Sequence, residues 1–164
     1  MTIYAMPGHL IRRLNQISVA LFMDRMAQAD IKLTPVQFAT LTTIRLNPGL
    51  DQASLAGLIA YDRATLGKVI DRLAARGLVC RTISVHDRRA RCLQLTNAGN
   101  ELLDAARPLV EAVQPEMLSG LSPTEQEQLI ALLKKTTDAG NALSRAPLAA
   151  ATQDQLKSDQ YSRG

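Results

Sequence analysis

The sequence is poor in the residues that carry most enzyme chemistry, with only two cysteines and two histidines among 164 residues. Two thiols cannot build a disulfide framework or a zinc site made of thiols alone. His9 and His86 stand far apart in sequence, and the chain has no glycine-rich phosphate loop and no nucleophile elbow. Because no group of residues suits acid–base, nucleophilic or metal chemistry, we predict a protein that is not an enzyme and holds no metal or cofactor.

Long apolar runs are also missing. No run approaches the roughly 18 residues that span a bilayer, and residues 1–7 lack the basic and apolar stretches of a signal peptide. We therefore expect a cytoplasmic protein with no membrane partner. What is present is a hydrophobic share of 46%, which suits one domain with a real core.

Charge is weakly positive overall but unevenly distributed. The formal net charge of +4 favours a polyanionic partner without establishing one. Six acidic residues fall within residues 101–127, whereas four arginines lie close together further upstream. These arginines are Arg81, Arg88, Arg89 and Arg91. Basic charge is therefore concentrated just after the segment 62–77.

Hydrophobic periodicity predicts a series of helices in the first half of the chain. The predicted segments are 9–29, 35–46, 51–59 and 62–76. Thr34 and Asp62 are suitable N-cap residues, and Gly77 suits the position just after a helix end. The core face of the second segment should use Phe38, Leu41, Thr42 and Leu46. The two segments that follow it form a helix-turn-helix.

The second half of the chain begins with a predicted hairpin. Two β-type segments, 78–83 and 91–95, enclose a polar stretch that forms its tip. A hairpin directly after a helix-turn-helix is typical of a winged helix. The next helix starts after Thr96, and Pro108 and Pro115 should bend or break it.

The last predicted helix starts at a capping box, Ser122-Pro123-Thr124-Glu125, and runs to about residue 139. The tail from Ser144 onward has few large apolar residues, so we expect it to be mobile or only loosely packed.

The segment 9–29 is apolar on more than one side, because Ile11 and Val19 widen the stripe made by Leu10 and Leu14. Such a helix would leave apolar area in water if it covered only one small domain. We therefore expect a second subunit to cover it. The predicted fold is mainly α with a small β-hairpin wing, in one integrated domain. Its parts are an N-terminal dimerisation helix (1–33), a winged helix-turn-helix lobe (34–96), C-terminal dimerisation helices (97–142) and a tail (143–164).

The helix opened by Asp62 has an apolar face and an opposite polar face. The polar face carries Arg63, Thr65, Lys68 and Arg72, which can bond phosphates or base edges. Such a helix can enter a major groove while it stays anchored in a core. An isolated polar face can also be merely solvated, but the helix-turn-helix before it and the basic wing after it favour DNA contact. Asp71 is a candidate for a structural pair with Arg72 or Arg76.

Five motifs occur in a characteristic order and spacing. They are Asp62-Arg63-Ala64-Thr65, Asp71-Arg72-Leu73 with Arg76-Gly77-Leu78-Val79, Asp87-Arg88-Arg89-Ala90-Arg91, Leu95-Thr96-Asn97-Ala98-Gly99 and Leu121-Ser122-Pro123-Thr124-Glu125. With them the chain resembles, over about residues 9–139, the multiple antibiotic resistance regulator (MarR) family of bacterial winged-helix transcription factors. The resemblance implies a homodimer with interlocked terminal helices over one palindromic operator, usually as a repressor.

The resemblance also assigns roles in the wing. In such proteins the reading helices enter successive major grooves and wing arginines reach the flanking minor groove. Arg89 matches the family's wing arginine, and Asp87 matches its acidic partner, which can hold an arginine extended through a charge-assisted bond. Arg88 and Arg91 are further DNA candidates, and His86 either contacts phosphate or merely sits at the wing tip.

Many members of this family release DNA when a small aromatic acid or phenol binds between the dimerisation helices and the DNA lobe. Residues 7–14 look most like regulators of aromatic and N-heteroaromatic acid catabolism, including the nicotinate-degradation type. His9, Arg12 and Arg13 suit such a ligand, because a cationic side chain clamps a carboxylate and an imidazole donates to a ring substituent. The alternative is that they form a polar helix face or dimer salt bridges. The predicted effector is a hydroxylated pyridine carboxylate.

Two other functions stay open. The first is a thiol sensor that uses Cys80 or Cys92; peroxide sensors of the family resemble one another in carrying a cysteine near the start of the first helix, where this chain has none. Neither thiol has an evident activating neighbour beyond Arg81 and Arg91. The second is a winged-helix module that binds protein instead of DNA.

Overall fold

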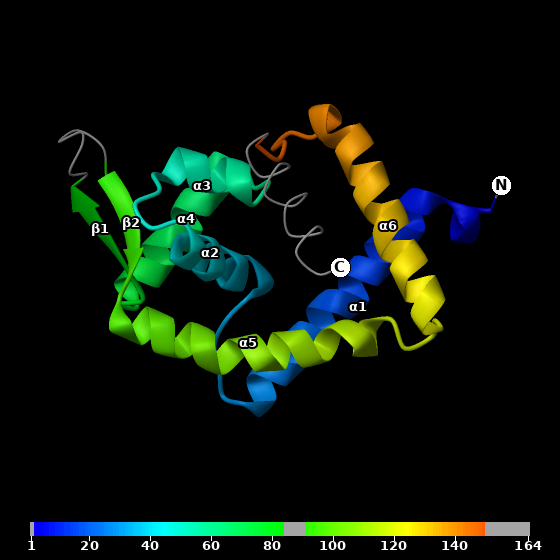
Figure 1. Cartoon of the computed structure of the whole chain (residues 1–164), viewed down its shortest axis with the longest axis horizontal. Coiled ribbons are helices and arrows are strands. Elements are labelled where there is room, and N and C mark those ends of the chain that lie inside the picture. The colour runs from blue at the N-terminus through cyan, green and yellow to red at the C-terminus, as the bar shows by residue number, and fades with distance from the viewer. Residues whose placement is uncertain (1, 84–90, 150–164) are drawn as a thin grey trace.

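The computed structural model describes residues 2–83 and 91–149, and this part of the chain holds six α-helices and one hairpin, which lies at an edge of the molecule (Figure 1). The elements are η1 (Ile3–Ala5), α1 (Pro7–Gln28), α2 (Pro35–Leu46), α3 (Gln52–Leu58), α4 (Arg63–Ala75), β1 (Val79–Ile83), β2 (Arg91–Leu95), α5 (Asn97–Met117), α6 (Pro123–Gly140) and η2 (Asn141–Leu143). The predicted class is confirmed, a winged helix-turn-helix flanked by N- and C-terminal helices. Within the described residues, every helix is too short or too polar to span a bilayer.

Local capping chemistry starts the helices where the sequence predicts. Thr34 opens α2 and Ser122 opens α6, each in a reciprocal capping box with the third residue of its helix, Gln37 or Glu125. The pKa of Glu125 is lowered, because its carboxylate accepts a bond first from the backbone N–H and then from the hydroxyl of Ser122. Asp62 caps α4 through a one-way bond, in which its side chain accepts from the Thr65 N–H.

The end of α4 is set by Gly77, as predicted. Its φ of +70° lies in the left-handed region, which glycine adopts without a Cβ clash. The Gly77 N–H donates to the carbonyl of Ala74 at 2.9 Å, and the Leu78 N–H donates to the carbonyl of Leu73 at 3.0 Å. This pattern closes the helix and turns the chain directly into β1.

The hairpin is antiparallel, with Val79 opposite Leu95 and Arg81 opposite Leu93. It is tied to the lobe on its other side, because the Leu93 N–H donates to the carbonyl of Leu50 at 2.8 Å. At its base the Thr96 hydroxyl donates to the Gly77 carbonyl at 2.6 Å. The wing is therefore anchored to both ends of the helix-turn-helix.

The core joins the C-terminal half of α1 to the lobe and to α5. The predicted inner face of α2 is partly wrong. Leu41 is fully buried, but Leu46 is 69% exposed, and Ile44 and Thr40 are buried instead. The reason is that α2 turns its 40, 41 and 44 positions toward the core, and Leu46 lies about half a turn beyond Ile44.

Of the predicted bend or break of α5, the break is wrong, because the helix continues through Pro108 and Pro115. Each proline removes one backbone hydrogen bond, to the carbonyl four residues earlier. These carbonyls belong to Asp104 and Glu111, which are exposed like the prolines themselves. Water can therefore satisfy them, and the helix does not have to end.

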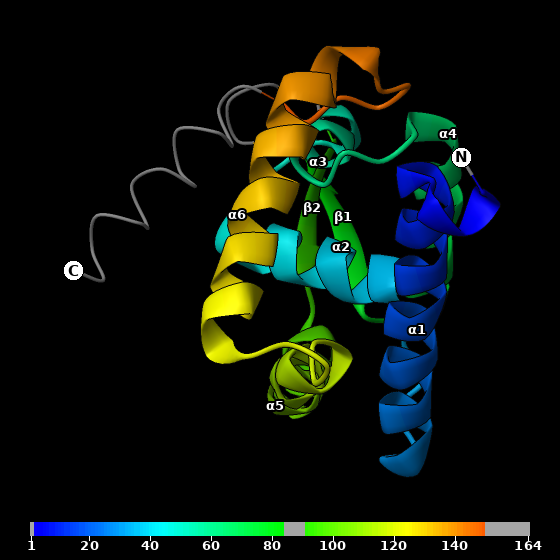
Figure 2. The ribbon, with the colours of Figure 1, turned by 90° about the vertical axis from the view of Figure 1, so that its right-hand side faces the viewer.

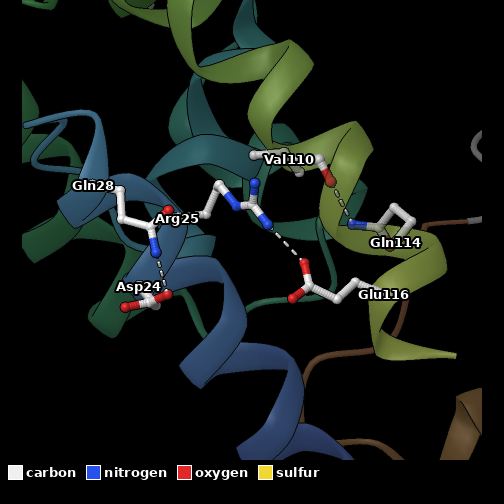
Figure 3. A network of polar contacts seen from close by, with 6 residues as sticks. All are labelled: Asp24, Arg25, Gln28, Val110, Gln114 and Glu116. Atoms are coloured by element: carbon white, nitrogen blue, oxygen red, sulfur yellow. Dashed lines mark hydrogen bonds and ion pairs between the residues drawn. The ribbon is translucent and has the colours of Figure 1, made fainter. Parts of the chain in front are cut away.

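Two long helices, α1 and α5, cross and form the frame of the molecule. Figure 1 shows α5 along one edge, with α6 returning from its end toward α3, and Figure 2 shows α1 and α6 on opposite sides of α2. Arg25 of α1 donates through Nη2 to Oε2 of Glu116 in α5 at 2.8 Å (Figure 3). This ion pair supplements the apolar contacts of Phe22 and Met26, the two buried residues of α1.

The first part of the tail makes a contact with the lobe that the sequence does not predict. Residues 144–149 lie against the lobe, where the Ala149 N–H donates to the carbonyl of Gly57 at 2.9 Å. The sequence analysis missed this contact because the segment has almost no large apolar residue. The rest of the tail, from residue 150, lies outside the described residues.

Candidate nucleic-acid interface and ligand cleft

The helix α4 divides into a buried and an exposed face, as its sequence predicts. Its four buried residues are Leu66, Val69, Ile70 and Leu73. The four predicted DNA-binding residues of this helix are all exposed: Arg63, Thr65, Lys68 and Arg72. None of the ion pairs among the described residues involves the three cationic ones. Their positive charges are therefore available to an external anion, while their role in binding DNA stays a prediction.

The N-terminus of α4 is held by Asp62. Its Oδ1 accepts from the Thr65 N–H and from the Thr65 hydroxyl, both at 2.8 Å. The backbone bond from Thr65 is the largest cause of a lowered pKa of Asp62, and the hydroxyl bond is the second. To make the predicted DNA contact, the Thr65 hydroxyl would have to give up its bond to Asp62 or accept a bond at its free lone pairs.

Asp71 forms a structural ion pair, but with a partner that the sequence analysis missed. It accepts from Arg81 of β1, and not from Arg72 or Arg76 as predicted. Adjacent residues on a helix do not face each other, which excludes Arg72. Arg76 instead donates through Nη1 to the carbonyl of Lys32 at 2.7 Å, before α2. Arg81, one of the four clustered arginines, therefore connects the hairpin to α4.

Four predicted wing residues, His86, Asp87, Arg88 and Arg89, lie outside the described residues. Arg91 is placed as the first residue of β2. The structure describes the base of the wing, which α4 and residue 50 hold on two sides.

The two cysteines lie on neighbouring strands but do not face each other. Cys80 is opposite Gln94, and Cys92 is opposite Thr82, so the two are diagonal neighbours. Diagonal pairs are about 7–8 Å apart, whereas the Cα atoms of a disulfide are usually about 5.5–6 Å apart. Both thiols are free and half-buried.

The predicted ligand residues gather on the first turns of α1. His9 is half-buried and meets the ring of Tyr4 edge-on, with centroids 5.8 Å apart. Arg12 is exposed and donates through Nη1 to Oε1 of Gln16 at 2.8 Å. Arg13 is also exposed. Positions 9, 12 and 13 lie on one side of the helix, so the structure brings these three residues together.

An apolar cleft of about 340 Å³ lies between α1 and the lobe, and we call it the α1–lobe cleft. Its lining residues are Val19, Pro35, Val36, Ala39, Ile59 and Tyr61. The predicted ligand residues do not line it. Arg12, Gln16 and Val19 nevertheless share one face of α1, and Arg12 lies about 10 Å from Val19 along the helix axis.

The sequence analysis missed the lobe side of this cleft. Its only signal is the apolar Ile59 and aromatic Tyr61 in the turn of the helix-turn-helix, together with Val36 and Ala39 on the outer face of α2. A second groove of about 300 Å³ lies between Leu14 of α1 and the α5–α6 corner, lined mostly by apolar residues such as Leu118 and Leu129.

The MarR family model matches residues 33–90, which include the helix-turn-helix and the first strand of the wing. The transcriptional repressor NicR from Pseudomonas putida is 34% identical over 131 residues, which are 80% of this chain and 82% of NicR. The chain belongs to the MarR family. It is therefore a MarR-type transcriptional regulator, and the predicted resemblance is confirmed.

Two solved MarR-family structures support the same assignment. BpsR from Bordetella bronchiseptica superimposes with a TM-score of 0.78 at 33% identity. The DNA binding of BpsR is regulated by 6-hydroxynicotinic acid. The match covers 84% of this chain and 97% of BpsR. A mutant of MarR from E. coli complexed with operator DNA has a TM-score of 0.74 at 27% identity, over 82% of this chain and 96% of that chain.

Proposed function

We propose that this protein is a homodimeric repressor that binds a palindromic operator and leaves it when a small aromatic acid binds. The observation that carries the proposal is α4, a helix with one fully packed face and one exposed cationic face. The MarR structure with operator DNA supports the partner. The relative NicR is a transcriptional repressor, which supports repression over activation.

The DNA contacts are assigned to α4 and the wing. Arg63, Lys68 and Arg72 supply cationic groups for phosphates or guanine edges, and Thr65 supplies a hydroxyl. Arg88, Arg89 and Arg91, with Asp87 and His86, form the predicted wing contacts in the minor groove. The anchored base of the hairpin supports this assignment, because it holds strands β1 and β2 beside α4.

Dimerisation is assigned to the predicted parts 1–33 and 97–142. Ile11 of α1 is 55% exposed and Leu132 of α6 is 61% exposed, and no residue of α6 is buried. Helices with this much apolar surface need a cover, and a second copy of the same helices supplies it. Two lobes related by a two-fold axis then read two half-sites, about one duplex turn apart.

The effector is assigned to the α1–lobe cleft and to the cationic start of α1. The cleft has the size and apolar lining of a site for one aromatic ring, and the Tyr61 hydroxyl supplies a polar group. Arg12 or Arg13 would clamp a carboxylate, and His9 would bond a ring substituent. The regulation of BpsR by 6-hydroxynicotinic acid supports a hydroxylated pyridine carboxylate as the effector.

Release follows from the position of this cleft between two parts of the molecule. A ligand that contacts Val19 on α1 and Val36 on the lobe favours one lobe position over another. If that position places the two α4 helices out of step with successive major grooves, the ligand weakens operator binding by its differential affinity for the two dimer states. Operator DNA must then weaken ligand binding by the same factor.

Fluorescence anisotropy on a labelled fragment of the gene's own upstream region, at fixed salt, tests the proposal. Wild type is compared with Arg63→Ala and with Lys134→Ala, a variant on α6 with the same charge change. We expect tight binding that only Arg63→Ala weakens, and release by one member of a panel of benzoates and hydroxylated pyridine carboxylates. Specific binding that no compound releases would overturn the effector, and absence of specific binding would favour the protein-interaction module.

The thiol sensor is the second candidate function. The diagonal register of Cys80 and Cys92 disfavours an internal disulfide between them. Substituting both cysteines with Ser should leave operator affinity unchanged. The effect of peroxide on operator binding should be the same in this double variant as in wild type. Loss of a peroxide response in that double variant would instead establish redox sensing.

A further inference from the structure

The C-terminal residues 141–149 form a defined segment, which we call the strap. The Asn141 side chain holds both backbone groups of Leu148: Nδ2 donates to its carbonyl at 3.0 Å, and Oδ1 accepts from its N–H at 2.7 Å. Ser144 accepts through Oγ from the Ala146 N–H at 3.1 Å. These bonds close the strap into a compact loop directly after α6.

The strap is attached to the helix-turn-helix at the end of α3. The Ala149 N–H donates to the Gly57 carbonyl at 2.9 Å, and this carbonyl is one of the last of α3. The same carbonyl also accepts from the Ala60 N–H at 3.4 Å, so the strap adds a second and shorter bond at this helix end. The end of α6 is thereby connected to the turn that precedes α4.

This attachment places Arg145 next to the start of α4. Arg145 of the strap lines an open cleft of about 340 Å³ together with Tyr61, Asp62 and Arg63. Arg63 is the first residue of α4, and both arginines are exposed. Among the described residues, neither arginine takes part in an ion pair. Oδ1 of Asp62 in the same cleft accepts two bonds from Thr65, and the cleft is lined by two arginines and this one acid.

The strap also lies on the side of the molecule where DNA would approach. In Figures 1 and 2 the strap and α3 lie at one edge, and α5 lies at the opposite edge. The same edge holds the outer end of β1 in Figure 1. A duplex that contacts Arg63 and the wing therefore passes within reach of the strap.

We propose that the strap is part of the DNA-binding surface, and that Arg145 contacts a backbone phosphate beside the groove that α4 enters. The inference rests on the proposed DNA-binding function and extends its interface beyond the helix-turn-helix and wing. DNA backbone phosphate fits because the site offers positive charge on an exposed, open surface, and the contact carries no base preference. In the dimer the strap adds one such contact in each subunit.

The test is the salt dependence of operator binding. Each neutralised phosphate contributes about −0.9 to the slope of log K against log[salt], so Arg145→Ala should make the slope of the dimer less steep by about 1.8. The ratio of operator to scrambled-duplex affinity should stay within about twofold of wild type, because a lost phosphate contact weakens both. Lys134→Ala, which removes the same charge from α6, should leave the slope unchanged.

Asn141→Ala tests whether the strap positions Arg145. It should reduce the slope as Arg145→Ala does, and the double variant should show no further change, while circular dichroism confirms an unchanged melting temperature of the lobe. Additive losses in the double variant would overturn the role of the strap.

Arg63→Ala separates this inference from the proposed function. If Arg63→Ala lowers the slope and Arg145→Ala does not, the strap is outside the interface and the inference is wrong. If the wild-type protein shows no specific binding and no salt dependence, the proposed function itself fails.

Discussion

Asp71 of α4 and Arg81 of β1 form an ion pair, with 2.5 Å between Oδ1 and Nη2. The pair joins the reading helix to the first strand of the wing, ten residues later in the chain. Both side chains are partly exposed, so water and salt screen their attraction. Its main effect is therefore on the angle between helix and hairpin, and in the proposed DNA complex this angle would decide whether α4 and the wing reach adjacent grooves together.

Asp71→Asn should lower operator specificity with little loss of stability. Removing an exposed pair costs about 0–1 kcal/mol of unfolding free energy. The wing loses one of its fixed contacts, so the ratio of operator affinity to scrambled-duplex affinity should fall several-fold. This ratio is the proper measure because removing an acid raises the affinity for any DNA. Asp104→Asn, which breaks the pair with Arg45 between α5 and α2, is the control and should leave the ratio unchanged.

Gly99→Ala should destabilise the whole fold. A Cβ at this buried position of α5 would lie 2.1 Å from the backbone carbonyl oxygen of Leu78, which cannot rotate away. Forcing extra atoms into such a contact costs about 1–3 kcal/mol or more. Urea unfolding followed by circular dichroism measures the change, and Gly120→Ala, with no atom within 4 Å of its Cβ, is the control. Equal stability of the two variants would show that the backbone at Leu78 shifts to make room for the added Cβ.

The features predicted correctly from the sequence depend on local chemistry. Thr34, Asp62 and Ser122 cap helices through bonds to residues three positions away, and Gly77 ends α4 through its own backbone freedom. The two faces of α4 follow from a regular helical period. Such signals need no knowledge of what packs where, so element order and fold class could be read from one chain.

The features missed depend on contacts between distant segments. The exposure of Leu46, the pairing of Asp71 with Arg81, and the Tyr61 side of the cleft are set by how helices and strands meet. The contact of Ala149 with Gly57 joins backbone groups 92 positions apart and leaves no trace in side-chain pattern. Periodicity reports which face is apolar but not which neighbour covers it.

The Asp62 cap predicts a pH dependence. Its pKa is lowered in the folded protein, chiefly by the backbone bond from Thr65, relative to an ordinary value of 3.8. The stabilising effect of the charged form is therefore fully present above about pH 3.8, and it is lost as the pH falls through the lowered pKa. Asp62→Asn keeps a capping oxygen but cannot be charged, so it should melt below wild type at pH 6 and equal it at strongly acidic pH.

Asp62→Ala separates the contribution of the capping hydrogen bond from the contribution of the negative charge. It removes the acceptor altogether, so its melting temperature should stay below that of Asp62→Asn at every pH at which the protein folds. If the difference in melting temperature between wild type and Asp62→Asn persists in strong acid, the charge of Asp62 is not the cause of that difference.

Ala39→Leu should uncouple effector binding from operator binding. Ala39 lines the α1–lobe cleft from α2 and is half-buried, so a leucine there fills space that a bound ring needs. Overfilling a packed site costs about 1–3 kcal/mol, which corresponds to roughly 5-fold to 150-fold weaker effector binding. Operator affinity without effector should stay within about twofold, because Ala39 belongs to α2 and contributes no side chain to the exposed face of α4. The measurement is the effector concentration that releases half of the labelled operator.

The matched control for that prediction is Ala112→Leu, the same substitution at an exposed position of α5. It should leave both the operator affinity and the releasing concentration unchanged. Arg12→Gln is a second, independent test. It should weaken the binding of effectors that carry a carboxylate, and it should not change the binding of the corresponding amide. If Ala39→Leu responds to effector like wild type while Arg12→Gln loses its response, the effector binds at the start of α1 and not in the α1–lobe cleft. Two lost responses together would place the ring in the cleft and its carboxylate toward Arg12, two helical turns away.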